Sequence, residues 1–182
     1  VAGGGRHGVL GRVSLGSVGQ TLLNSSTVPV ALSPRGMRHA PLDGLSRITV
    51  MLGESGRWRG GLSKARTFAD RAGVPLRLVT VATGDSQDTA EIEKRTEALL
   101  AEVRLDLTGL DDQRVQIVHA HSTSAAVLAM EWNRNELAFL GSARLAQSGR
   151  LFLGPDANKI LRVLPVPLVA VPADPADVGG AT

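Results

Sequence analysis

A glycine-rich stretch near the start of the chain is the first candidate for chemistry. Residues 3–17 read GGGRHGVLGRVSLGS, and Gly3, Gly5 and Gly8 match the G-x-G-x-x-G pattern of dinucleotide-binding enzymes. Those enzymes place an acidic residue about 20 positions later to bind the ribose. The next acidic residue here is Asp43, so the dehydrogenase interpretation fails and a different phosphate-binding loop is favoured.

Two other clusters carry reactive side chains. His119 and His121 stand two positions apart and form a possible metal pair, but no carboxylate lies beside them in the sequence, which favours ordinary histidines at a strand end. Ser122 follows at the start of an expected helix. It lacks the G-x-S-x-G context of a hydrolase nucleophile, so helix capping explains it more simply.

The composition restricts the class of protein. The chain has 182 residues, 43% of them apolar, no cysteine and a net charge of +3, which fits an α/β domain of ordinary size and excludes disulfides and zinc–thiolate sites. With 3% aromatic residues, we expect no nucleic-acid partner. No membrane-spanning run and no signal segment are apparent, so we expect a cytoplasmic protein without a membrane partner.

An internal repeat determines the expected domain organisation. Shifting the chain by 138 positions aligns residues 3–34 with residues 141–172 without a gap, and ten of the 32 positions are identical. Unrelated segments of average composition would share roughly two or three. We therefore predict the end of a first repeat at residues 1–35 (the first copy), a linker at 36–45, a complete repeat at 46–175 (the second copy) and a flexible tail at 176–182.

The second copy alternates between strand and helix patterns. Expected strands are 47–52, 74–82, 114–119, 136–140 and 166–171. Expected helices begin near Trp58, Ser86, Thr123 and Pro155, with Gly73 ending the first and residue 133 ending the third. This order predicts a parallel α/β sheet with helices on both faces, which binds ligands at the carboxyl ends of its strands.

The two glycine loops carry a family resemblance. In each, a glycine is followed by two residues, an arginine, nine residues and another glycine, as in Gly3, Arg6 and Gly16. This pattern resembles the G-x2-G-x9-G-[S/T] motif of ATP-binding universal stress proteins. The resemblance implies a flavodoxin-like, adenine nucleotide alpha hydrolase-like sheet of five parallel strands, with final strands that pair across a dimer-like interface.

The resemblance also implies which residues bind ATP. They are those of the first loop (residues 3–17) and the helix start behind it: Gly3, Arg6, Gly8, Gly16, Ser17 and Val18. Arg6 replaces the family's second motif glycine and reads either as a phosphate clamp or as a solvated side chain. Ser17 reads either as a phosphate donor or as a plain helix cap.

The second loop (residues 141–155) departs further from the motif. Pro155 stands where the family has Ser or Thr and offers no N–H, and Asp156 would repel a phosphate. Gly53 occupies the position where nucleotide-binding relatives carry an aspartate. We therefore expect ATP only at the first loop, with further walls from a missing first-repeat segment or a second chain.

Two proline-bounded apolar runs are expected to pair with each other. Residues 28–33 and 166–171 have the features of edge strands, and we predict that they pair antiparallel, within one chain or by self-association of two. The favoured function is a non-catalytic stress-response module without a resident metal. The alternatives are a dimerisation module that binds no nucleotide and, in another class, a small hydrolase or nucleotidyl-transfer enzyme.

Overall fold

The computed structural model describes residues 2–3, 16–34, 44–53, 58–83, 89–106, 115–143 and 146–174. The helices are α1 (Ser17–Ser25), α2 (Arg59–Ala72), α3 (Thr89–Asp106), α4 (Thr123–Ala129) and α5 (Pro155–Val163). The strands are β1 (Ala2–Gly3), β2 (Val30–Ser33), β3 (Arg47–Leu52), β4 (Leu76–Thr83), β5 (Val115–Ala120), β6 (Glu136–Gly141) and β7 (Leu168–Val171). Strands and helices alternate along the second copy, as its apolar pattern predicts.

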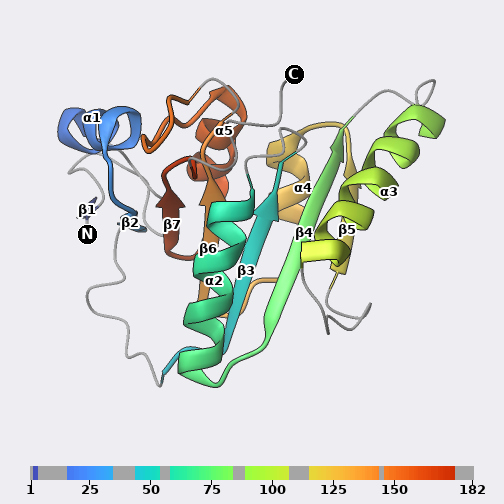
Figure 1. The fold of residues 1–182 in the computed structure, drawn as a ribbon, viewed down its shortest axis with the longest axis horizontal. Helices are drawn as coiled ribbons and strands as arrows, with labels where there is room; N and C mark the ends of the chain where they lie inside the picture. The colour runs from blue at the N-terminus through green and yellow to red at the C-terminus, as the bar shows by residue number, and fades with distance from the viewer. Residues whose placement is uncertain are drawn as a thin grey trace.

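All seven strands form one sheet, in the order β1-β2-β7-β6-β3-β4-β5 (Figure 1). Every neighbouring pair is parallel except β2 and β7, which are antiparallel. The five strands of the second copy form the expected parallel sheet. Numbered within that copy, their order is 3-2-1-4-5, the doubly wound order with a switch point between β3 and β6, rather than the 2-1-3-4-5 order of flavodoxin itself.

Helices cover both faces of the sheet, each over its own apolar core. Helices α2 and α3 lie on the face toward the viewer in Figure 1 and bury Leu62 and Val103 against β3 and β4. Helices α1, α4 and α5 contribute Leu23, Val127 and Leu161 to the second core. Gly73 ends α2 with a positive φ of 64°, as the sequence predicts for a left-handed cap.

The internal repeat is visible in the structure. Helix α1 spans residues 17–25 and α5 spans 155–163, and strand β2 spans 30–33 while β7 spans 168–171, so each pair of bounds differs by 138. The pairing of Ala2 with Leu32 also recurs 138 positions later, as Leu140 with Ala170. The two copies therefore share local structure as well as sequence.

The two copies meet through β2 and β7. In this antiparallel pair Ala31 lies opposite Val169, and Val30 and Leu32 lie opposite Ala170 and Leu168. Because Ala31 and Val169 are equivalent residues of the two copies, a pseudo-two-fold axis passes through their pairing. The predicted antiparallel pairing of these strands is confirmed, and it lies within one chain.

The helix expected at 123–133 is shorter than predicted. Helix α4 ends at Ala129, because Met130 adopts an extended conformation with φ −77° and ψ 144°. Two arginines then hold the carbonyl of Glu131: Arg47 donates to it at 3.3 Å and Arg77 at 3.1 Å. These tertiary bonds hold the segment after α4 in a non-helical path.

Candidate functional site

The second loop is closed by its own hydrogen bonds. The Ala143 N–H donates to the carbonyl of Phe152 at 2.8 Å, and the Phe152 N–H donates to Ser142 Oγ at 3.4 Å. The Ala146 N–H donates to the carbonyl of Ala143 at 2.9 Å. Buried Ser142 donates in turn to the carbonyl of Val171 at 3.1 Å. These N–H groups are therefore engaged within the protein and do not face an open phosphate cradle.

The second loop is also tied to the first copy. The Leu151 N–H donates to the carbonyl of Ser26, at the end of α1, with an N···O distance of 2.8 Å. Leu151 and Leu153 are buried in the same apolar core as Leu23 of α1. The loop thus packs as part of the contact between the copies.

The starts of α1 and α5 differ although their backbones match. Gly16 and Gly154 are the N-caps, with extended φ/ψ values of −79°/176° and −68°/−179°. Among the described residues, an added Cβ at Gly16 would meet no atom within 4 Å, whereas at Gly154 it would lie 3.1 Å from the Cβ of Ala143. The first turn of α1 contains no acidic residue. No described residue therefore packs against the α1 cap, and its first turn carries no negative charge, which fits an anion, whereas the α5 cap is packed.

The predicted nucleotide-binding residues are only partly within the described ranges. Gly3 lies in β1, and Gly16, Ser17 and Val18 lie together and exposed at the start of α1. Arg6 and Gly8 lie outside the described residues. In the second copy exposed Gly53 stands at the aspartate position after β3, so that position offers no carboxylate for a ribose.

Within the histidine and serine cluster, Ser122 has a structural role. Ser122 caps α4, and its Oγ accepts the Ala125 N–H at 3.2 Å, as the capping interpretation predicts. His119 lies near the end of β5 and His121 just beyond it. Among the described residues, no three histidine or acidic side chains come together in a metal-binding arrangement.

The sequence of this chain is similar to those of known proteins. No family model matches the chain. Over 174 residues the chain is 30% identical to universal stress proteins of Mycobacterium bovis and Mycobacterium tuberculosis, covering 88% of this chain and 59% of each relative. The predicted resemblance to universal stress proteins is confirmed by these relatives. The chain spans 59% of the length of these relatives.

Solved structures support the same fold. A protein of unknown function from Pseudomonas aeruginosa matches with a TM-score of 0.65 at 16% identity, covering 97% of this chain and 63% of that one. A universal stress protein from Archaeoglobus fulgidus matches with a TM-score of 0.57 at 24% identity, covering 89% and 56%. None of the helices in the described residues has the length and apolar character needed to cross a bilayer.

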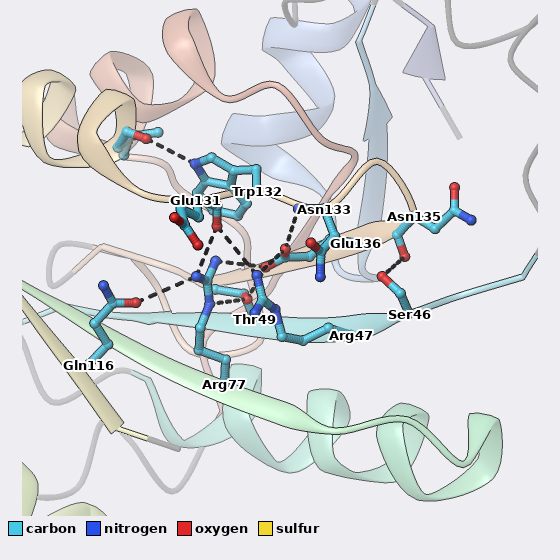
Figure 2. Close-up of polar contacts among 11 residues, drawn as sticks. Ser46, Arg47, Thr49, Arg77, Gln116, Glu131, Trp132, Asn133, Asn135 and Glu136 are labelled. Carbon is cyan, nitrogen blue, oxygen red and sulfur yellow. Dashed lines mark hydrogen bonds and ion pairs between the residues drawn. The ribbon is translucent and has the colours of Figure 1, made fainter. Parts of the chain in front are cut away.

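A buried carboxylate organises the opposite edge of the sheet. Glu136, at the start of β6, accepts Nη2 of Arg47 and Nη2 of Arg77, each at 2.7 Å (Figure 2). It also accepts the Thr49 hydroxyl and, at 3.0 Å, the backbone N–H of Asn133. All of these groups lie at or near the amino ends of the strands, away from the edge where doubly wound sheets bind ligands.

Two charged groups of this Glu136 cluster, Glu136 and Arg77, have shifted pKa values. Burial would raise the pKa of Glu136, but the hydrogen bonds from Arg47, Thr49 and the Asn133 N–H outweigh it and hold the pKa below its ordinary value. Burial lowers the pKa of Arg77, while attraction to Glu136 opposes that shift. A carboxylate held ionised by this many donors is suited to a structural clamp rather than to proton transfer.

Trp132 completes the cluster. The guanidinium of Arg77 lies 5.1 Å from its ring centroid, and its Nε1 donates to the carbonyl of Val127 at 2.9 Å (Figure 2). No motif in the sequence predicted this cluster. A signal was present, because Arg47, Arg77 and Glu136 begin or nearly begin three apolar strands, and the amino ends of neighbouring parallel strands meet at one edge.

Proposed function

We propose that this chain is a non-catalytic stress-response module in which ATP or another adenine nucleotide binds at the first loop and not at the second. The main support for this proposal is the difference between the first residues of the two equivalent helices, Ser17 in α1 and Pro155 in α5. Remaining walls of such a pocket would come from residues outside the described ranges or from a second chain.

The first helix start supports phosphate binding. The first N–H groups of a helix and its dipole attract anions, and glycine permits close approach of the backbone. At α1 these features coincide with exposed Gly16 and Ser17 and with a first turn free of acidic residues. Ser17 would add a hydroxyl donor. When bound, the nucleotide would supply the anionic group that these donors hold.

The second helix start does not fit a phosphate. Pro155 occupies the first helical position of α5 and has no N–H, and the N-cap Gly154 is buried against Ala143. The loop before it donates Ala143, Ala146 and Phe152 N–H groups internally. We infer at most one nucleotide per chain.

The absence of catalysis is part of the proposal. The nucleophile candidate Ser122 is engaged as a helix cap. The buried carboxylate Glu136 is engaged by two arginines at the amino edge of the sheet. Purified protein incubated with ATP should therefore release no phosphate above the rate of the buffer, and sustained release would support the hydrolase alternative.

Exchanging the residues at the two equivalent positions tests the nucleotide proposal. Proline is well tolerated at the first position of a helix, so Ser17→Pro should remove an N–H and a hydroxyl while leaving α1 folded. ATP at a hundredfold excess over its Kd should stabilise the unchanged protein by about 2.7 kcal/mol and raise its Tm. Ser17→Pro should abolish that shift.

Pro155→Ser is the matched control. It restores the family's residue at the second loop but leaves the loop's internal hydrogen bonds in place, so the ATP-dependent shift should stay as in the unchanged protein. A shift that survives Ser17→Pro would refute nucleotide binding at the first loop. No shift in the unchanged protein would favour the pairing module that binds no nucleotide.

A further inference from the structure

The three residues after β7 form a short connection across the second loop. The Gly149 N–H donates to the carbonyl of Ala173 at 3.0 Å, and the Ala173 N–H donates to the carbonyl of Arg150 at 3.1 Å. The two bonds pair residues 172–174 with the loop like a short piece of antiparallel sheet. Ala173 is 2% exposed, so this segment is packed rather than lying loosely on the surface.

The other side of the segment rests on the first turn of α2. A Cβ added at Gly60 would lie 3.3 Å from the Cβ of Asp174 and 3.6 Å from the carbonyl oxygen of Pro172. Because Gly60 lacks a side chain, the segment can pass directly over the helix. Residues 172–174 thus bridge the α2 start and the second loop, at the carboxyl edge of the sheet where this fold binds ligands.

We propose that Pro172–Asp174 is a strap that closes the second loop and takes the place of an anionic ligand there. The Gly149 N–H is a loop donor, and the Ala173 carbonyl oxygen accepts it in the position that an anion's oxygen would otherwise take. Gly149 has a positive φ of 69°, a conformation that glycine adopts readily, so the loop can present this N–H without backbone strain. The inference rests on the proposed function, because it explains how the described part of the second loop is held in place without a nucleotide.

Substitution at Gly60 displaces the strap from outside the loop. Gly60→Leu places a side chain where Asp174 lies, and leucine also favours helix more than glycine does, so α2 itself should not be weakened. Amide hydrogen exchange of Gly149 and Ala173 should become roughly tenfold faster or more in this variant. Ser63→Ala, an exposed position on the same helix, should leave both rates unchanged.

A milder variant covers the case in which Gly60→Leu fails to fold. Gly60→Ala requires the strap to move by only a few tenths of an ångström and should raise the same two exchange rates by a smaller factor. Unchanged exchange of Gly149 and Ala173 in a folded Gly60→Leu or Gly60→Ala variant would overturn the strap.

Inorganic phosphate tests whether the strap stands in for an anion. Millimolar phosphate should slow exchange of the Gly149 amide in the opened variant and leave it unchanged in the parent protein. No effect of phosphate on the opened variant would overturn this substitution of strap for ligand. Neither measurement depends on ATP binding at the first loop, so failure of the proposed function and failure of the strap are distinguishable.

Discussion

Helices α1 and α5 have equivalent bounds and equivalent caps, yet within the described parts of the chain only the α5 cap is packed against another residue. Serine stands at the first position of α1 and proline at that of α5, and no described atom lies beside Gly16 where Ala143 lies beside Gly154. The backbone of the repeated unit is therefore independent of its capacity to bind an anion. That capacity depends on one side chain and on what the preceding loop already contacts.

The outer sides of the two helices, and the residues that follow each helix, differ in exposure as well. Leu22 is 38% exposed, whereas its equivalent Ile160 is 6% exposed; Val28 is 62% exposed and Val166 2%. Helix α4 packs on α5 and accounts for the difference, since within the described residues nothing comparable covers α1. The second copy thus provides a complete apolar environment and the first copy a partial one.

The largest expected effect is at Glu136, which has no equivalent in the described part of the first copy. Glu136→Ala would leave Arg47 and Arg77 without their shared carboxylate, and breaking a buried pair in this way costs about 3–5 kcal/mol. Urea unfolding should show this loss for the whole sheet, because both copies share it. Glu136→Gln keeps a hydrogen-bond acceptor and should lower the free energy of unfolding by less than Glu136→Ala does. Equal losses of stability in the two variants would show that the charge of Glu136 is unimportant.

A matched pair of leucines tests the difference in cover. Leu23 and Leu161 are equivalent residues, and each is 2% exposed. Leu161→Ala should cost about 2–5 kcal/mol, and Leu23→Ala should fall at the lower end of that range because the partly exposed α1 can relax toward the cavity. Urea unfolding of both variants measures this, and a greater loss at Leu23 would contradict the comparison.

The smallest expected effect is a dependence on pH. Because the folded pKa of Glu136 lies below its ordinary value of 4.5, its contribution is fully present above that pH and is lost as the pH falls through the folded pKa. The free energy of unfolding should decline by up to about 1.4 kcal/mol per pH unit for this proton. In the Glu136→Gln variant, the free energy of unfolding should decline less at low pH than in the unchanged protein. An equal decline in both proteins would mean that other carboxylates cause it.

Local patterns were sufficient to predict much of this fold. The 138-residue repeat predicted equivalent helix and strand bounds, and Gly73 and Ser122 marked the end of α2 and the start of α4. The early end of α4 could not be predicted this way, because it depends on arginines from β3 and β4, far away in the sequence. The strap is another such case, since nothing local to Ala173 indicates that Gly149 is its partner.

The pairing of Ala31 with Val169 at the pseudo-two-fold axis also protects the alignment of the joining strands. A slip of β2 by one residue would turn the buried side chain of Leu32 toward the opposite face of the sheet. Leu168 would keep its orientation, because β7 is also paired with β6. The burial of β2 side chains in the core shared with α5 therefore fixes how the two copies are aligned.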